Sequence, residues 1–356
     1  MPRKLLVLFI SLAFGLFLSE LLLRHLFLNP KPFVWPPHLH MVFKPTPGIL
    51  PGVTGDAHFI TNSKGIRADE PTPNSYQILA VGGSTTECSY LDQAEAWPYQ
   101  LQLGLQEKGY KVWVGNAGVS GHSTKIHRAK LPHLFAQHPS LDAVLMLIGG
   151  NDFLYYLAHL DSQPSVVPFY KKTGFWNFGR FLKQRLDPRQ KILVHNYNTG
   201  ESHVEWRGKR QSAAIISKLP NLEMGISEYQ KNINYIADLA QQNSIRIIFM
   251  TQPTIWRPDL LPAEQAFLWM GWKKHLNSGY YYSVEALAEG MKQYNDALLE
   301  ICEQRKLECI DLADKLPKNT NVFYDDLHLN EAGSARVAEI VKNYLLKSKL
   351  ALNVVD

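Results

Sequence analysis

The stretch of the chain best suited to chemistry is residues 78–88, where an apolar run leads into two glycines and a serine. Gly82 and Gly83 tolerate backbone angles and close approaches that a side chain would block, so the chain can turn sharply there. Such a turn would present the Ser84 hydroxyl at the edge of a sheet. Ser84 is therefore a candidate nucleophile, which would need a base, an acid and oxyanion donors. The Gly-Gly-Ser tripeptide alone is weak evidence, because most such tripeptides are ordinary loops.

A second candidate stretch is the loop 323–328, near the C-terminus. Neutral His328 could take the Ser84 proton as attack begins, and Asp325 could hold the opposite ring nitrogen and stabilise the imidazolium. Asp326 is the competing carboxylate, but on the other side of an extended loop it would point away from the histidine. We predict Asp325 as the acid.

Donors for an oxyanion are available at three positions. The backbone N–H groups of Ser84 and Gly121 and the side-chain amide of Asn151 could meet the developing negative charge. Each such donor typically contributes about 2.7–4 kcal/mol in the transition state. A local role stays open for Asn151, because asparagine is frequent in turns, where it hydrogen-bonds the backbone.

Each of these candidates follows a stretch that is typical of a β-strand. Five mainly apolar runs are expected to form strands, at about residues 78–81, 111–117, 143–148, 245–251 and 307–312. Continuous apolar strands that alternate with helices indicate a parallel sheet covered on both faces. Chemistry in such sheets collects at the carboxyl ends of the strands. Complementary polar residues after four of the five strands therefore favour catalysis at one edge.

Helical periodicity predicts the elements between the strands. Pro98 suits the first turn of a helix that ends near Gly109. Apolar residues spaced by three or four predict helices over residues 226–240 and 287–301. Asn330 is expected to cap the final helix.

Four blocks of the sequence resemble those of the SGNH hydrolases, also called GDSL lipases and esterases. In chain order they are Val81-Gly-Gly-Ser-Thr, Asn116-Ala-Gly-Val-Ser-Gly-His, Gly149-Gly-Asn-Asp and Asp325-Asp-Leu-His. The resemblance spans about residues 76–348 apart from an insertion. It implies a flavodoxin-like three-layer α/β sandwich around a five-stranded parallel sheet. It also implies that the catalytic residues are Ser84, Asp325, His328, Gly121 and Asn151.

One residue departs from the family pattern. Gly83 stands where the family name has Asp. Many members that resemble this chain, with a Gly-Gly-Ser-Thr-Thr-Glu block and an N-terminal anchor, share that change. The family covers carbohydrate, lipid and protein-linked esters, so the resemblance leaves the substrate open.

Residues 1–28 are predicted to form a signal anchor. Residues 5–19 are uncharged and strongly apolar, and Arg3 and Lys4 precede them. A helix that continued to Leu28 would reach about 36 Å, which is enough to cross a bilayer core. We expect an uncleaved transmembrane helix, with the rest of the chain on the periplasmic or cell-surface side. A cleaved signal is the alternative and would give the same compartment.

Two segments lack the strand and helix alternation. Residues 29–75 are rich in proline and are expected to form an extended linker, with an edge strand or hairpin at about 60–67. Residues 153–225 interrupt the hydrolase-like region of 76–348 as an insertion, with a hairpin predicted at about 192–206. Residues 171–210 hold ten Lys or Arg against three Asp or Glu. This basic run is either a solvated surface or a contact for anionic headgroups or an acidic glycan.

The composition gives little indication of binding partners. The net charge is only +5. The three cysteines make no metal pattern and are expected as buried or semi-buried thiols, and their odd number leaves at least one unpaired if any disulfide forms. We expect no metal, no cofactor and no nucleic-acid partner. Several aromatic residues could either line a substrate cleft or pack in the core: Phe153, Tyr155, Tyr156, Trp176, Trp256, Trp269, Trp272 and Tyr280–Tyr282.

The combined pattern predicts a serine esterase that forms an acyl-enzyme on an extracytoplasmic ester of a carbohydrate or lipid. An O-acyltransferase acting on a glycan would use the same acyl-enzyme and would differ in the acceptor of the second step. A catalytically silent binding or assembly protein is the alternative from another class. The intact serine, histidine, aspartate and asparagine favour the enzymes over the silent protein.

Overall fold

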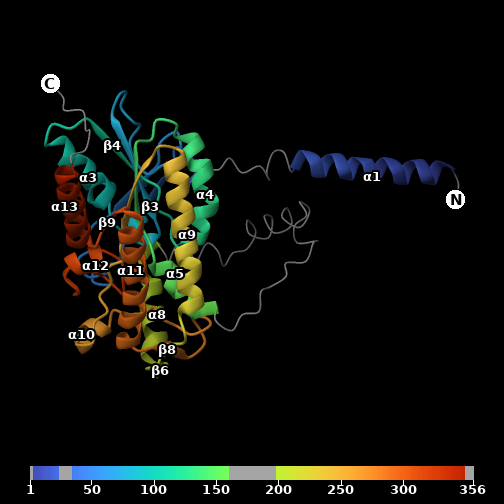
Figure 1. The fold of residues 1–356 in the computed structure, drawn as a ribbon. Helices are drawn as coiled ribbons and strands as arrows, with labels where there is room; N and C mark the ends of the chain where they lie inside the picture. Colours follow the sequence, from blue (N-terminus) through green and yellow to red (C-terminus); the bar gives the residue numbers. More distant parts are fainter. Residues whose placement is uncertain (1–2, 24–33, 160–197, 349–356) are drawn as a thin grey trace. The chain divides into compact units, whose positions relative to one another are not determined.

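The computed structural model describes residues 3–23, 34–159 and 198–348 (Figure 1). The chain divides into two units, and helix α1 (Arg3–Leu23) belongs to the first of them. Within the described ranges no helix has the length and apolar character needed to cross a membrane, so the transmembrane helix predicted for residues 1–28 is not found there. All further elements belong to the second unit, which comprises residues 33–161 and 196–356.

A five-stranded parallel sheet forms the centre of the second unit (Figure 1). Its strands are β3 (Tyr76–Gly82), β4 (Val112–Asn116), β5 (Ala143–Leu147), β7 (Arg246–Met250) and β9 (Glu308–Ile310). They lie in the order β4-β3-β5-β7-β9, and every neighbouring pair is parallel. The predicted α/β class, strand count and flavodoxin-like order are confirmed.

Helices cover both faces of this sheet. On one face α3 (Trp97–Gln106) packs against α13 (Glu331–Lys347), and on the other α9 (Glu223–Gln242) packs between α4 (Thr124–Gln137) and α11 (Val284–Arg305) (Figure 1). This arrangement explains the continuous apolar character of the strands, because parallel strands covered on both faces have no solvent-facing side.

Local sequence signals set the helix boundaries. Pro98 lies in the first turn of α3, where its missing N–H costs nothing. The Asn330 side chain accepts a hydrogen bond from the Gly333 N–H at 3.0 Å, so it caps α13 as predicted. The apolar positions of α11 are buried at spacings of four and three: Leu287, Met291, Tyr294, Leu298 and Ile301.

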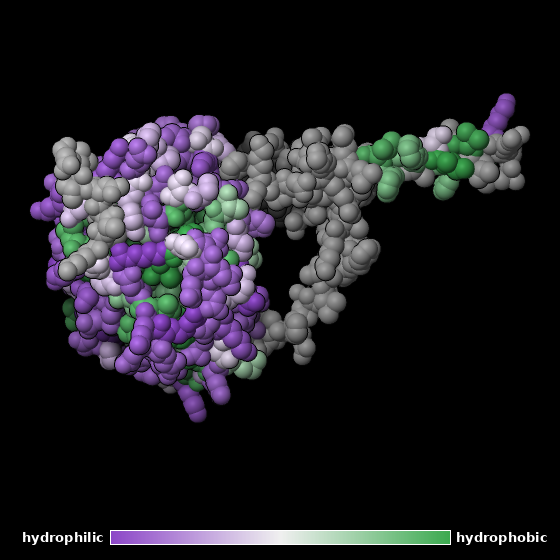
Figure 2. Space-filling model, turned by 45° about the horizontal axis from the view of Figure 1, so that its top comes forward, coloured by the Kyte–Doolittle hydropathy of each residue, from purple (hydrophilic) through white to green (hydrophobic). Residues whose placement is uncertain are grey.

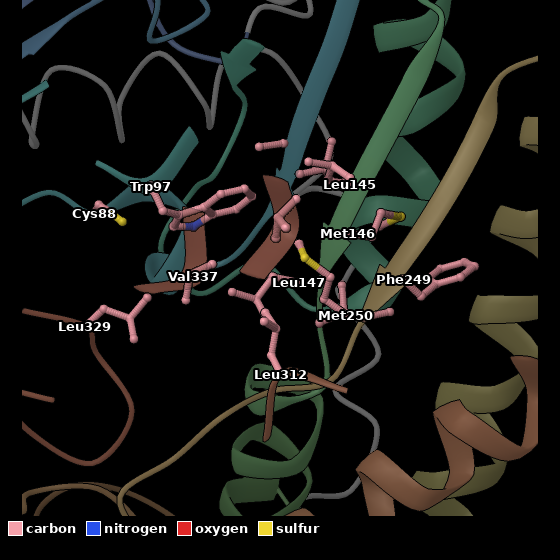
Figure 3. Packing of buried hydrophobic residues seen from close by; sticks show 14 of the residues in the cluster. Cys88, Trp97, Leu145, Met146, Leu147, Phe249, Met250, Leu312, Leu329 and Val337 are labelled. Atoms are coloured by element: carbon pink, nitrogen blue, oxygen red, sulfur yellow. The ribbon is translucent and has the colours of Figure 1, made fainter. Parts of the chain in front are cut away.

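The interior of the unit is one hydrophobic cluster. Figure 3 shows part of it, with Leu147 of β5 and Met250 of β7 gathered near Val337 of α13. Hydrophilic residues cover most of the face seen in Figure 2, and hydrophobic residues gather near its centre.

Shorter elements complete the unit. Strands β1 (His40–Phe43) and β2 (Ala57–Ile60) form an antiparallel pair, and β6 (Ala214–Ile216) pairs in parallel with β8 (Tyr280–Tyr282). At the predicted edge strand of 60–67, Arg67 makes a single bridge to Asn116. The remaining short elements are α2 (Ser84–Glu87), η2 (Gln93–Glu95), α5 (Gly150–His159), α8 (Glu201–Gln211), α10 (Pro262–Gln265) and α12 (Leu312–Lys315).

Two predictions are wrong. The second half of the hairpin predicted at 192–206 is helical, because α8 begins directly after Gly200, which adopts the left-handed conformation; the first half lies outside the described residues. The cysteines are not all thiols, since Cys302 and Cys309 form a disulfide and Cys88 is a free buried cysteine.

Candidate active site

Ser84 stands where β3 runs into α2, as the first residue of that short helix. The backbone N–H groups in the first turn of a helix have no acceptor within the helix, so this turn leaves donors available beside the hydroxyl. Gly83 allows a close approach in this turn. A Cβ atom on Gly83 would lie 2.4 Å from the Asn151 amide nitrogen, so the aspartate of the family name at position 83 would require the Asn151 side chain to move.

The structure brings three predicted residues into one hydrogen-bonded chain. The Ser84 Oγ lies 2.7 Å from Nε2 of His328. The other ring nitrogen, Nδ1, lies 2.9 and 2.7 Å from the two carboxylate oxygens of Asp325. Because a carboxylate accepts, Nδ1 carries the proton and Nε2 is left to accept from the serine hydroxyl. This is the protonation pattern that a general base requires.

Asp325 is fully buried, and its charge is met from several sides. Its carboxylate accepts hydrogen bonds from the backbone N–H groups of Leu327 and His328 and from Nε1 of Trp269 at 2.8 Å. Burial opposes ionisation, but the adjacent His328 outweighs it and holds the pKa of Asp325 below its ordinary value. Burial also disfavours the His328 imidazolium, yet Asp325 raises the pKa of His328 above the ordinary value.

Asp326 points away from the histidine, as the extended loop predicts. Its carboxylate accepts from Nε1 of Trp256 at 2.9 Å and from the backbone N–H groups of Trp269 and Met270 at 2.7 and 3.0 Å. Burial, opposed by Arg210, raises the pKa of Asp326. Asp326 therefore anchors the segment around Trp269.

Gly121 and Asn151 lie beside Ser84 and line the same cavity. Gly121 has a φ of +77°, which a residue with a side chain adopts only with strain. The Asn151 side-chain amide donates to the backbone carbonyl of His122 at 2.9 Å, so the amide is held across the glycine loop. The five predicted site residues are therefore together.

Two buried polar side chains support the glycine loop. The Glu87 carboxylate accepts from the Ser120 N–H and from the Ser89 hydroxyl. The Asn116 amide donates to the Thr86 carbonyl at 2.7 Å. The contacts of Glu87 with Ser120 and of Asn116 with Thr86 join the loop before Gly121 to the helix that begins with Ser84. Glu87 was not among the predicted site residues, although a glutamate in a block of otherwise apolar and small residues was a usable signal.

A cavity of about 450 Å³ opens at these residues. Of the aromatic residues considered from the sequence, Tyr155, Trp269 and Trp272 line it. Phe153 and Trp256 are fully buried in the core, and Trp176 lies outside the described residues. The cavity is also lined by residues that the sequence analysis did not predict: Ser89, Tyr90, Ser120, His203, Trp206 and Tyr324.

Helix α8 places a second histidine beside the acid. Nε2 of His203 lies 3.7 Å from the Asp325 carboxylate, and Nδ1 lies 3.2 Å from the Gly200 carbonyl. Burial lowers the pKa of His203 to about 4, although Asp325 opposes the shift. His203 is therefore neutral near pH 7 and does not compete with His328 for an ion pair with Asp325.

Two arginines on the same side of α8 are buried, contrary to the solvated surface considered for the basic run. Arg207 donates to the carbonyls of Ile49, Phe267 and Tyr324, and Arg210 donates to those of Met270 and Tyr282. The spacing of His203, Arg207 and Arg210 by four and three was a sequence signal for one polar helix face. Residues 171–197 of the run lie outside the described residues.

Part of the chain is similar in sequence to known esterases. Esterase TesA of Pseudomonas aeruginosa is 34% identical over 97 residues, which is 27% of this chain and 47% of that protein. An arylesterase of Vibrio mimicus is 36% identical over 80 residues, 22% of this chain and 40% of that protein. The matches thus span less than half of these relatives. A crystal structure of TesA covers 76% of this chain and 97% of its own, at 16% identity and a TM-score of 0.44.

The family model for the GDSL-like lipases and acylhydrolases matches residues 80–336. The match includes the serine turn, the glycine loop, the Asn151 region and the Asp325–His328 loop. The chain therefore belongs to the GDSL-like lipase/acylhydrolase family.

Proposed function

We propose that this protein is a serine esterase that cleaves carboxylic esters through an acyl-enzyme on Ser84. The observation that carries the proposal is the hydrogen-bonded chain from the Ser84 hydroxyl through His328 to Asp325. Membership of the acylhydrolase family supports the same reaction class.

In the first half-reaction, the Ser84 oxygen attacks the ester carbonyl while Nε2 of His328 takes its proton. The imidazolium that forms is stabilised by Asp325. The same proton then passes to the leaving alkoxide, which departs as the alcohol and leaves an acyl-Ser84. In the second half-reaction, water gives its proton to His328, attacks the acyl group and releases the acid, and the proton returns to Ser84.

The backbone N–H groups of Ser84 and Gly121 and the Asn151 amide are the proposed oxyanion donors. Preorganised donors of this kind stabilise the developing charge without reorganisation at the moment of reaction. The hydrogen bond to the His122 carbonyl holds the Asn151 amide nitrogen beside Gly83, the residue that precedes Ser84.

We propose further that residues 1–28 export the enzyme and hold it at a membrane, and that the substrate is an extracytoplasmic ester of a carbohydrate or lipid. Arg3 and Lys4 before an uncharged apolar run support export. The disulfide between Cys302 and Cys309 supports an oxidising compartment. A reporter fused after Pro30 should be active outside the cytoplasm and stay with membranes, and a soluble cytoplasmic fusion would reject this part of the proposal.

Hydrolysis of nitrophenyl acetate, butyrate and octanoate by the full-length protein tests the proposed reaction. We expect turnover by the wild type and none by Ser84→Ala, with both proteins folded. If added sugar acceptors raise the rate of alcohol release and acylated sugar is formed, the protein is an O-acyltransferase. No turnover, together with no labelling of Ser84 by a fluorophosphonate, would reject the enzyme and favour the silent assembly protein.

A further inference from the structure

Trp269 lies where the catalytic acid meets the substrate cavity. Its indole N–H donates to the Oδ2 atom of Asp325 at 2.8 Å. Its backbone N–H donates to Asp326 at 2.7 Å. Trp269 therefore contacts both carboxylates of the final loop, one through its ring and one through its main chain.

Helix α8 fixes the backbone on both sides of Trp269. Nε of Arg207 donates to the Phe267 carbonyl at 3.2 Å, and Nη1 of Arg210 donates to the Met270 carbonyl at 2.6 Å. Both guanidinium groups are buried, where an unmade hydrogen bond costs most. The backbone that carries the indole is thus held on both sides by buried hydrogen bonds.

The same indole forms part of the cavity wall. Its ring centroid lies 4.4 Å from that of Trp206 and 5.7 Å from that of Trp272, and all three rings line the cavity. The half-buried ring faces the space that opens at Ser84, while its N–H faces the buried acid.

We propose that Trp269 is a positioning residue of the triad, which orients the Asp325 carboxylate through its indole N–H while its ring forms the wall of the substrate cavity. The inference rests on the proposed esterase function. It assigns to one side chain two separable effects, one on the acid and one on the fit of the substrate.

The effect on the acid has a definite sign. A hydrogen-bond donor to Asp325 partly neutralises the negative charge of the carboxylate. Loss of the donor therefore strengthens the electrostatic attraction between Asp325 and the His328 imidazolium, which raises the pKa of His328 further. His328 acts as a neutral base, so the rate falls as the pH falls through its pKa. Loss of the Trp269 donor therefore shifts this acid limb of the pH profile to higher pH.

Other charged and titratable groups also face this pair and stay unchanged in the test: His203 and Arg207 of α8, Glu87 of α2, and Tyr324 and Asp326 of the final loop.

The test compares Trp269→Phe with Trp272→Phe in the full-length protein. Both substitutions remove part of an indole from the cavity wall. Within the described residues, however, Trp272 makes no hydrogen bond to Asp325 or His328. We measure kcat and KM on nitrophenyl butyrate and the pH dependence of Ser84 labelling by a fluorophosphonate.

We expect Trp269→Phe to lower kcat by about tenfold, the equivalent of one hydrogen bond to a charged group, and to shift the acid limb of labelling upward. Trp272→Phe should change KM and leave the acid limb in place. The inference is overturned if the two variants behave alike, or if the acid limb of Trp269→Phe coincides with that of the wild type.

A second substitution covers the case in which Trp269→Phe folds poorly. Incorporation of 3-benzothienylalanine at position 269 keeps the bicyclic shape and replaces the N–H by sulfur. It should reproduce the lower kcat and the upward shift with KM unchanged, and a wild-type profile would overturn the inference. Failure of the proposed function is distinguishable, because it would appear as wild-type protein that neither turns over esters nor labels at Ser84.

Discussion

At the scale of single residues, Ser84 and His328 should behave as one unit, because one proton passes between them at 2.7 Å. We predict that Ser84→Ala and His328→Ala each abolish esterase activity and that the double variant loses little more. Independent, additive losses of kcat would contradict a shared proton transfer.

The two adjacent aspartates allow a matched comparison. Asp325→Asn should lower kcat far more than Asp326→Asn, because only Asp325 contacts the His328 ring. Asp326→Asn should mainly lower the melting temperature, since Asp326 accepts three N–H donors in the buried interior. A larger kcat loss for Asp326→Asn than for Asp325→Asn would show that Asp325 is not the catalytic acid.

Asn151 tests the electrostatic part of the mechanism. Asn151→Ala should lower kcat by about a hundredfold or more with little change in KM, because the bond to the oxyanion strengthens only as charge develops. If Asn151 has only a local role, through its hydrogen bond to the His122 carbonyl, Asn151→Ala should instead lower the melting temperature. Near-wild-type kcat in a well-folded Asn151→Ala protein would remove this residue from the site.

At the scale of elements, the disulfide joins the end of α11 to β9, because Cys302 lies in the helix and Cys309 in the strand. We predict that protein denatured without reductant shows one reactive thiol per chain, that of Cys88, and three after reduction. Mass spectrometry after alkylation counts them. Three thiols before reduction, in protein purified from its own compartment, would contradict the disulfide.

The sequence predicted some elements better than others, for physical reasons. The central strands were predicted because burial on both faces requires unbroken apolar runs, and α11 because its apolar spacing is regular. Helix α8 was missed because the Asn198-Thr-Gly200 turn signal is local, whereas the helix is held by distant contacts of Arg207 and Arg210.

The site residues also divide into those placed by local sequence signals and those placed by distant contacts. Residues that directly follow strands, such as Ser84 and Asn151, could be placed from topology alone. His203 and Trp269 could not, because they reach Asp325 from segments whose position relative to the sheet depends on tertiary packing.

At the scale of the whole molecule, three buried histidines should control stability in acid. Burial lowers the pKa of His127 to about 3 and the pKa values of His138 and His203 to about 4, from an ordinary value of 6.5. At these three histidines the unfolded chain binds more protons than the folded one between about pH 6.5 and 4, so the stability that they contribute falls as the pH falls through this window, and the raised pKa of the buried Asp152, about 6, offsets part of the loss. The lowered pKa of Asp325 adds a loss at still lower pH.

Melting temperatures measured between pH 7 and 4 test this prediction. We expect a decrease below about pH 6.5, because above that value the raised pKa of His328 adds stability as the pH falls. The exposed His133 offers a control, because His133→Gln should keep the full decrease. A melting temperature that stays constant down to pH 4 would show that these histidines are accessible to protons in the folded state.

The opposite orientations of Asp325 and Asp326 bear on how this sequence can vary. The loop is closed by the bond from the Tyr324 N–H to the His328 carbonyl, and successive carboxylates occupy opposite sides of it. Insertion or deletion of one residue inside this loop would exchange the two sides, placing the wrong carboxylate toward the imidazole and the other against Trp256. In a library of variants, substitutions at exposed neighbouring positions should therefore survive selection while changes of length between positions 324 and 328 do not, so related chains are expected to diverge here in side chains but not in spacing.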